Sequence, residues 1–296
     1  MSTEEFRLFR DMVYDYCGIF FQDDVKYFLE RRLNPRLQEK QAASFAEYYR
    51  HLRYSPTRRQ EMESMVEVLT TNETYFFREE YQLKAFGEEI LPIIIKEKGI
   101  DRRLRIWSAG CSTGEEAYTV AILLLEEPRL RGWDMEIFAN DISKKVIQIA
   151  RKGLYGKSSF RATNPYFLGK YFQPYNSQHM VRDEVRALVS FGQLNLLDED
   201  MLQLIGKVDV IFCRNVMIYF DKPARLKVLK TFHGKLHDHG YLLLGHSESL
   251  MNISTAFELV HLRNDMVYRK PKTLGEGGES HVGQESSGNH SRPGNR

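Results

Sequence analysis

The stretch Leu104-Arg-Ile-Trp-Ser-Ala-Gly-Cys-Ser-Thr-Gly-Glu-Glu116 decides the fold class of this 296-residue chain. Its first five residues predict a strand, a turn of small residues follows, and an apolar helix is expected to begin near Glu115. Further apolar strands are predicted at 135–139, 208–213 and 240–244. Strands that alternate with helices form right-handed βαβ units. We therefore predict an α/β fold with a mostly parallel sheet.

The remaining residues divide into parts of different character. Residues 1–70 predict an all-α domain, since apolar side chains recur at helical spacing without strand alternation. Residues 71–95 are interpreted as a linker or lid with a connecting helix, and 96–270 as the α/β domain, whose end forms an antiparallel edge hairpin. Residues 271–296 lack aromatic residues and are expected to be a disordered tail.

A small antiparallel β insertion is predicted at about 157–192, where Phe, Tyr, Asn and Gln are frequent. Short strands are expected near 180–182 and 187–191.

The helical domain contains several helix-boundary signals. Asp23 and Asp24 are expected to cap its second helix, which Pro35 should kink or restart because proline lacks an N–H group. Ser44 and Glu47 match a capping box for its third helix.

Composition excludes several classes of protein. Lys and Arg number 42 against 40 Asp and Glu, so the net charge of +2 gives no indication of nucleic-acid binding. The longest apolar run, 120–125, is far shorter than the roughly 20 residues that span a bilayer. The N-terminus does not resemble a signal peptide, and three widely spaced cysteines indicate neither a disulfide framework nor a zinc site. We expect a cytoplasmic, metal-free protein without membrane insertion.

The turn after the first strand contains Gly110 and Gly114. Glycine lets backbone approach a ligand closely, and the following helix start offers free N–H groups. A dinucleotide site would require G-x-G-x-x-G, so a ligand with a carboxylate fits better than a pyrophosphate. The same residues are equally consistent with a plain tight turn.

Polar residues follow two other predicted strands. Asp141 ends the second strand, where an acidic side chain commonly holds ribose hydroxyls. It can equally be the cap of the next helix. Arg214, Asn215 and Tyr219 follow the buried strand 208–213 and are expected at the same ligand crevice.

The segment 71–79 joins the two predicted domains. Asn72, Thr74 and Arg78 stand there beside three aromatic residues. The segment is either a lid over the crevice or an interdomain linker that packs its aromatic side chains.

Six blocks of sequence together resemble the chemotaxis receptor methyltransferases of CheR type. They are Thr71–Arg78, Trp107–Tyr118, Phe138–Ile142, Leu194–Leu197, Phe212–Phe220 and Gly245–Ser249. The resemblance covers roughly residues 5 to 270 in the right order. It implies a protein-glutamate O-methyltransferase that uses S-adenosylmethionine, with S-adenosylhomocysteine as the product. It also implies an all-α N-terminal domain ahead of a Rossmann-like domain with a small β insertion.

The resemblance also implies which residues form the site. Those around the cofactor would be Asn72, Thr74, Arg78, Gly110, Glu116, Asp141, Asn195, Leu196, Arg214 and Asn215. Asp141 would take the ribose hydroxyls, and Asn195 and Leu196 would flank the adenine end. Tyr219 would lie near the transferred methyl group, and Arg78 and Tyr219 are the candidate catalytic residues. Either Glu115 or Glu116 would point inward.

A glutamate acceptor explains the absence of a catalytic His or Cys dyad. A glutamate side chain has a reference pKa of about 4.3, so it is already ionised at neutral pH and needs no general base. Attack then neutralises a carboxylate and a sulfonium together, which a dry site favours. Arg78 is expected to close the lid or orient one carboxylate oxygen, since a bidentate grip on the nucleophile would blunt it.

Methyl-accepting chemotaxis receptors are the implied partners. Arg32, Arg36 and Lys40 fall at helical spacing and predict a basic stripe facing the acidic receptor, or simply a solvated helix face. Binding of a receptor C-terminal tether to the insertion is doubtful, because 178–186 lacks the glycine expected beside a tether groove.

Two other functions compete with this interpretation. Asn164-Pro-Tyr-Phe167 superficially resembles the motif of nucleic-acid amino-methyltransferases, but it lies in the insertion and the net charge is near zero. A non-catalytic module that binds S-adenosylmethionine or S-adenosylhomocysteine and signals by docking is the second alternative. The presence of both Arg78 and Tyr219 favours an enzyme.

Overall fold

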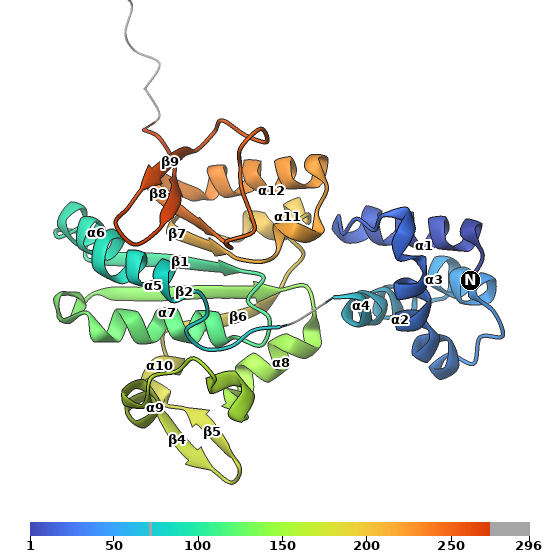
Figure 1. The fold of residues 1–296 in the computed structure, drawn as a ribbon, viewed down its shortest axis with the longest axis horizontal. Coiled ribbons are helices and arrows are strands. Elements are labelled where there is room, and N and C mark those ends of the chain that lie inside the picture. Colours follow the sequence, from blue (N-terminus) through green and yellow to red (C-terminus); the bar gives the residue numbers. More distant parts are fainter. Residues whose placement is uncertain (71–72, 273–296) are drawn as a thin grey trace, which may run out of the picture.

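A seven-stranded sheet forms the centre of the computed structural model, which describes residues 1–70 and 73–272 (Figure 1). Its strands are β1 (Arg103–Ala109), β2 (Asp134–Asp141), β6 (Val189–Gln193), β7 (Val208–Cys213), β8 (Leu236–Leu244), β9 (Glu258–His261) and β10 (Met266–Arg269). The order is β6-β2-β1-β7-β8-β10-β9, and the pairs from β6 to β8 are parallel. The last two strands pair antiparallel, which confirms the predicted α/β class and edge hairpin.

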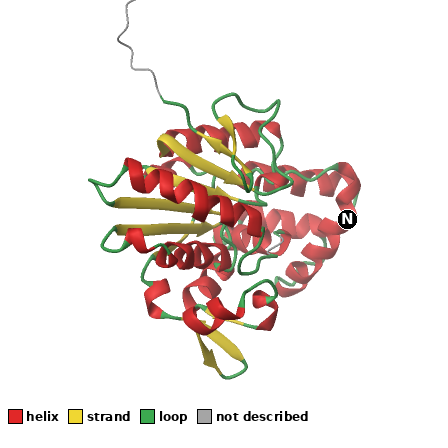
Figure 2. Cartoon of the chain, turned by 60° about the vertical axis from the view of Figure 1, so that its left-hand side comes forward, coloured by secondary structure: helices red, strands yellow, loops and turns green. Residues whose placement is uncertain are grey.

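Helices cover both faces of this sheet (Figure 2). One face packs on α5 (Glu80–Ala85), a π-helical turn (Phe86–Ile90), α6 (Leu91–Glu97) and α7 (Glu115–Glu126), and the other on α11 (Glu199–Gln203) and α12 (Lys222–Lys235). Side chains alternate along a strand, so Ile106 faces the first group and Trp107 the second. Trp107 meets Phe232 of α12 edge to face at 5.1 Å.

The chain enters the sheet in its middle and leaves in both directions. After β1 it moves outward to β2 and β6, with α7 and then α8 (Lys144–Lys152) as connections. It then returns to β7 beside β1 and continues through α12 to β8. Connections therefore diverge between β1 and β7, and the strand tips there form the crevice in which open α/β sheets bind ligands.

Four helices form the N-terminal part of the chain, as predicted. They are α1 (Thr3–Cys17), α2 (Lys26–Glu39), α3 (Phe45–Tyr54) and α4 (Arg58–Leu69). One boundary prediction was wrong: Asp23 and Asp24 lie in a 3-10 turn without capping α2. Of the two outcomes expected at Pro35, a restart does not occur, because α2 runs through this residue. The Ser44 hydroxyl accepts from the Glu47 N–H as expected.

The predicted basic stripe on α2 also requires correction. Arg36 and Lys40 pair with Glu61 of α4, at 2.6 Å and 2.8 Å to the same carboxylate oxygen. The Glu61 side chain is only 1% exposed, and Tyr48 donates a further hydrogen bond to it at 2.7 Å. Arg36 and Lys40 are therefore engaged by a buried carboxylate of the helical domain, although Lys40 and Arg32 both remain exposed.

The insertion is a second, three-stranded antiparallel sheet of order β3-β5-β4 (Figure 1). It comprises β3 (Leu154–Tyr155), α9 (Pro165–Tyr171), β4 (Phe172–Tyr175), β5 (Gln178–Val181) and α10 (Asp183–Arg186). The strand expected near 187–191 is not part of it, because β6 pairs parallel with β2 at the edge of the main sheet. The predicted span 157–192 is thus too long at its end, and the small sheet begins earlier, at Leu154.

Two further predictions concern membrane-spanning helices and the C-terminal tail. No helix among residues 1–70 and 73–272 is long and apolar enough to cross a membrane. The tail predicted at 271–296 lies, from residue 273 onward, outside the described residues.

Candidate functional site

A pocket lies at the carboxyl ends of β1, β2, β6 and β7 and contains about 1000 Å³ of empty space, part of it open to solvent. Its lining includes every predicted site residue that the structure describes: Thr74, Arg78, Gly110, Glu116, Asp141, Asn195, Leu196, Arg214, Asn215 and Tyr219. Asn72 lies outside the described residues.

The turn after β1 closes tightly against the loop after β7. Gly110 has a φ of +82°, and a Cβ atom there would lie 2.4 Å from a methyl group of Val216. The N–H groups of Gly110 and Cys111 both donate to the Asn140 carbonyl at 2.8 Å. Glycine is thus required both by the backbone conformation and by the approach of the second loop.

Asp141 lies at the pocket, but the N-cap of α8 is Ser143, whose side chain accepts from the Val146 N–H at 3.4 Å. The Asp141 carboxylate accepts from the Ser112 and Ser143 N–H groups, each at 2.9 Å, and so holds the first turn and the start of α8. It also lines the pocket while only 8% exposed. Burial raises the pKa of Asp141, and the bonds from these N–H groups act in the opposite direction.

Asn140 is a site residue that sequence reasoning quoted but did not single out. Its side-chain oxygen accepts from the Trp107 indole at 2.6 Å, and its amide donates to the Leu194 carbonyl at 3.1 Å. The residue is fully buried and lines the pocket. One side chain therefore ties together the tips of β1, β2 and β6.

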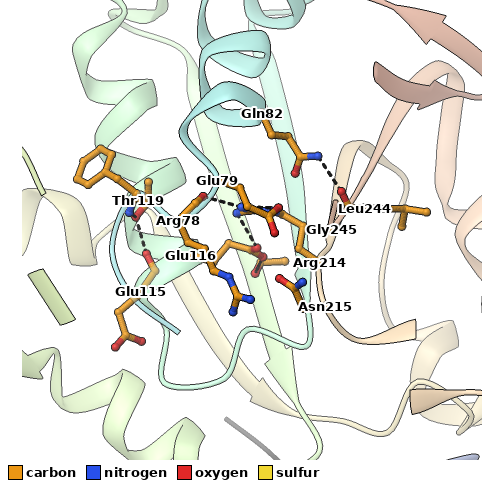
Figure 3. A network of polar contacts seen from close by, with 12 residues as sticks. Arg78, Glu79, Gln82, Glu115, Glu116, Thr119, Arg214, Asn215, Leu244 and Gly245 are labelled. Carbon is orange, nitrogen blue, oxygen red and sulfur yellow. Dashed lines mark hydrogen bonds and ion pairs between the residues drawn. The ribbon is translucent and has the colours of Figure 1, made fainter. Parts of the chain in front are cut away.

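An acidic pair surrounds one buried guanidinium on the opposite side of the pocket (Figure 3). Arg214 lies 3.0 Å from Glu79 and 3.2 Å from Glu116, and it also donates to the Arg78 carbonyl. Ser108 donates to Glu116 at 2.7 Å. Burial raises the pKa of Glu116, and Arg214 acts in the opposite direction. In the ionised state this cluster carries one more negative than positive charge, which suits a cationic ligand.

The structure distinguishes the two neighbouring glutamates at the start of α7. Glu116 lines the pocket, whereas Glu115 turns toward the insertion (Figure 3). Glu115 accepts from Thr113 at 2.6 Å and from Ser159 at 2.9 Å. Burial raises the pKa of Glu115 as well. Glu116 is therefore the residue placed to meet a ligand.

The segment 73–79 folds back on itself beside the pocket. The Arg78 guanidinium donates to the Glu73 carbonyl at 2.7 Å and stands over the Tyr75 ring at 5.9 Å. Phe77 and Glu79 both have left-handed φ values, +59° and +58°. In this turn the Arg78 carbonyl accepts a hydrogen bond from Arg214. Thr74, earlier in the same loop, lines the pocket.

The N-terminal helices supply the wall that sequence reasoning missed. Cys17 and Ile19, at the end of α1, line the pocket, and Ile19 pairs with Phe220 as an isolated antiparallel bridge. The Asn195 side chain donates to the Tyr16 carbonyl at 2.6 Å. The docking of two distant parts of the chain creates this wall, and no local pattern signals it.

Tyr219 stands at the mouth of the pocket with 36% of its surface exposed. Its carbonyl accepts from the Phe20 N–H at 2.9 Å, so the residue is held by both parts of the chain. Tyr219 is therefore an exposed residue of the pocket lining.

The thiols of the lining are chemically quiet. Burial raises the pKa of Cys17 to about 12 and that of Cys111 well above its ordinary value, so both are neutral near pH 7. The lining contains no His or Lys among residues 1–70 and 73–272. Apart from these thiols and two tyrosines, the ionisable groups of the described lining are the carboxylates of Glu73, Glu116 and Asp141 and the guanidinium groups of Arg78 and Arg214.

Comparison with known sequences identifies the architecture. Residues 4–70 match the CheR methyltransferase all-alpha domain, and residues 72–266 match the CheR methyltransferase SAM binding domain. The chain belongs to the CheR methyltransferase family. Its second domain is therefore a methyltransferase domain that binds S-adenosylmethionine, in agreement with the predicted fold class and cofactor.

Several curated relatives span nearly the same length. Chemotaxis protein methyltransferase 2 of Vibrio cholerae is 38% identical over 273 residues, which cover 92% of this chain and 94% of that protein. A chemotaxis protein methyltransferase of Vibrio parahaemolyticus is 34% identical, with 91% and 98% covered. Chemotaxis protein methyltransferase 1 of Pseudomonas aeruginosa is 33% identical, with 90% and 98% covered.

Proposed function

We propose that this protein transfers a methyl group from S-adenosylmethionine to glutamate side chains of methyl-accepting chemotaxis receptors, forming methyl esters. The observation that carries the proposal is the strand-tip pocket itself. It combines an excess of buried carboxylate over guanidinium with two neutral thiols and, among the described residues, no His or Lys. Such a pocket suits a cationic methyl donor and an acceptor that is already anionic.

The residues present fit the donor. When bound, S-adenosylmethionine supplies an electrophilic methyl group on a positively charged sulfur. In the proposal Asp141 holds the ribose hydroxyls, for which its position at the end of β2 is typical. Leu196 and Asn195 flank the adenine end, and part of the Asn195 carboxamide is already engaged with Tyr16.

Charged groups of the pocket complete the proposed donor site. Glu116 and Arg214 hold the polar end of the donor, and Asn215 and Thr74 stand beside them in the lining. Gly110 allows the close backbone approach that its positive φ and missing Cβ make possible. Asn72 is assigned to the same site on family resemblance alone.

A glutamate carboxylate is the proposed acceptor because it needs no deprotonation at neutral pH. The chain's contribution to rate is then positioning and the exclusion of water, and in-line placement of reacting atoms is worth several kcal/mol. Tyr219, exposed at the mouth, is proposed to position the incoming carboxylate or the methyl group. Arg78, which ties the 73–78 loop to itself, is proposed to keep this wall closed or to orient one carboxylate oxygen.

We further propose a receptor partner and a cytoplasmic site of action, of which the names of the relatives support only the role in chemotaxis. Relatives spanning nearly the whole chain are chemotaxis protein methyltransferases. The cytoplasmic region of such receptors is the proposed substrate, without a requirement for a receptor tether, and no nucleic acid is involved.

Transfer of a radiolabelled methyl group to receptor-containing membranes tests the proposal. A glutamate methyl ester releases volatile methanol on mild alkali treatment, so we expect alkali-labile label on the receptor. Asp141→Ala should abolish it, whereas Asp183→Ala, at an exposed insertion residue, should not. Alkali-stable label would point to nitrogen methylation, and cofactor binding without transfer would identify a docking module instead.

A further inference from the structure

The segment Gly245–Ser249 follows β8 and has no role in the site as described so far. Its Glu248 reaches the loop that follows β7. One carboxylate oxygen accepts from the N–H groups of Asn215 and Gly245 at 2.8 Å and 2.7 Å. The other accepts from the N–H groups of Val216 and Ile218 at 3.0 Å and 3.2 Å. One side chain thus receives four main-chain hydrogen bonds.

The loop after β7 depends on these bonds for its shape. Asn215 adopts a left-handed φ of +59°, a conformation that costs a non-glycine residue free energy. Within the loop, the N–H groups of Tyr219 and Phe220 donate to the carbonyls of Val216 and Met217, at 3.2 Å and 3.1 Å. The N–H groups of Asn215, Val216 and Ile218 point instead at Glu248. Successive N–H groups that converge in this way form an anion-binding concavity, here filled by a carboxylate of the same chain.

Main-chain dipoles, and no cationic side chain, face this carboxylate. Among the described residues Glu248 has no ion-pair partner. Burial raises the pKa of Glu248, and the four N–H bonds act in the opposite direction. Such a carboxylate acts mainly by fixing the shape of the loop and not by pairing with a cation, because each of its oxygens holds two main-chain N–H groups.

The approach of the two loops is close enough to require a glycine. A Cβ atom on Gly245 would lie 2.8 Å from both the main-chain and the side-chain nitrogen of Asn215 (Figure 3 shows the two residues side by side). Gln82 holds the neighbouring Leu244 carbonyl at 2.7 Å from the other side. The end of β8 is therefore a fixed platform on which Glu248 sets the loop after β7.

We propose that Glu248 is a positioning residue for methyl transfer, acting through the 215–218 loop to place Asn215 and Tyr219 at the pocket. The inference rests on the proposed function, because it assigns Tyr219 to the transfer step. Glu248 is not among the residues that line the pocket. Its effect on the reaction is entirely through the loop that it shapes.

Glu248→Gln tests this role with almost no change in volume. The amide nitrogen replaces one acceptor, so two of the four N–H groups would face another donor. We expect kcat to fall about tenfold or more, since small displacements of positioning groups cost rate steeply. KM for S-adenosylmethionine should change less than about threefold, because Asp141 and Glu116 bind the donor from other elements. Glu258→Gln, the same change at an exposed residue of β9, should leave both constants unaltered.

A double-mutant cycle separates positioning from general destabilisation. If Glu248 acts through Tyr219, then Glu248→Gln should cost much less in a Tyr219→Phe background than in the wild type. Independent, additive losses would overturn the proposal. Glu248→Asp keeps the charge but reaches only part of the loop, so it should give an intermediate kcat; it also serves if the Gln variant does not fold.

A crystal structure of the Glu248→Gln protein decides the matter independently of activity. We expect the 215–219 loop to shift by roughly 1 Å or more relative to β7. An unmoved loop would overturn the inference even if the wild-type protein transferred no methyl group. Conversely, an inactive wild type with a displaced loop in the variant would refute the proposed function, whereas the finding that Glu248 shapes the 215–219 loop would stand.

Discussion

The N-terminal helices and the β insertion, which Figure 1 shows as separate parts beside the main sheet, contribute to the pocket in different ways. The helices supply lining residues themselves: Cys17, Ile19 and Thr70. The insertion, residues 154–188, supplies none of the lining among the described residues. It packs instead against the segment 73–79, which does line the pocket. The N-terminal helices thus form a direct wall, whose own residues line the pocket. The segment 73–79 forms a supported wall, because the insertion packs behind it.

The support consists of aromatic and cationic contacts. Phe76 stacks on Phe160 at 5.1 Å, and its N–H donates to the Ser159 carbonyl at 2.9 Å. Arg161 stands 3.8 Å from the centre of the Tyr75 ring. Its guanidinium also pairs with a carboxylate of the same segment, that of Glu73, at 2.8 Å. A change in the insertion should therefore reach the pocket only through the position of this segment.

Phe76→Ala breaks the supported wall most severely. The ring is fully buried and meets Phe160, Phe172 and Tyr155. Removing a buried phenylalanine should lower the free energy of unfolding by about 3–5 kcal/mol. Chemical denaturation measures the loss. Tyr81→Ala, at an aromatic residue of α5 that is 65% exposed, is the control and should cost less than about 0.5 kcal/mol; an equal loss in the two variants would contradict the argument.

Asn195→Ala breaks the direct wall. The substitution leaves the Tyr16 carbonyl and the Leu197 N–H without the partners that they have at 2.6 Å and 3.0 Å. A loss of about 1–3 kcal/mol in unfolding free energy is expected. Because Asn195 also lines the pocket, Kd for S-adenosylhomocysteine should rise in the same variant, as titration calorimetry can measure. Stability lost with an unchanged Kd would show that this wall is not direct.

The difference between the two walls also explains which pocket residues could be predicted from the sequence. Gly110, Asp141 and Arg214 could be assigned to one crevice because the carboxyl ends of parallel strands meet at one edge of a sheet. That rule uses only local patterns and strand order. Ile19 could not be assigned by this rule, because its contact with Phe220 arises from the docking of segments about two hundred residues apart.

The remaining errors have equally specific causes. The strand β6, Val-Ser-Phe-Gly-Gln, lacks an apolar run because it lies at the edge of the sheet, so it was assigned to the insertion. The basic stripe failed because a buried carboxylate on α4, Glu61, takes up Arg36 and Lys40. Helical spacing shows which residues share a face, but it does not show what that face meets.

Arg161→Ala should have a smaller effect and separates support from lining. Arg161 is partly exposed, so its ion pair is worth at most about 1 kcal/mol, and its cation–π contact adds about 0.5–1 kcal/mol. We expect kcat to fall several-fold through the displaced segment, with S-adenosylhomocysteine binding nearly unchanged. Arg182→Ala, an exposed arginine of the same insertion, is the matched control. A rise in Kd without loss of kcat would mean that the insertion acts on the ligand directly.

The smallest expected effect depends on the charged side chains, which lie on the supported wall and not on the direct wall. Glu116, Glu79 and Arg214 lie on the supported side, whereas the N-terminal helices contribute Cys17 and Ile19. Burial raises the pKa of Glu116, so part of the ligand-free protein carries a protonated Glu116 above the ordinary carboxyl pKa of 4.5. A cationic donor favours the ionised form. Its binding should therefore release protons and tighten as the pH rises through the folded pKa.

The expected pH effect is a few-fold decrease in Kd for S-adenosylmethionine between about pH 5 and pH 7, where an α-amino group stays protonated. S-adenosylhomocysteine lacks the sulfonium charge and should show a flatter profile. Glu116→Gln should remove most of the slope, whereas Glu115→Gln should keep it, although burial raises the pKa of Glu115 too. Equal slopes in the two variants would place the relevant charge elsewhere. Glu115 faces Ser159, whereas Glu116 lines the pocket. The two variants therefore make the same substitution on opposite sides of the start of α7, and only one of them changes the pocket.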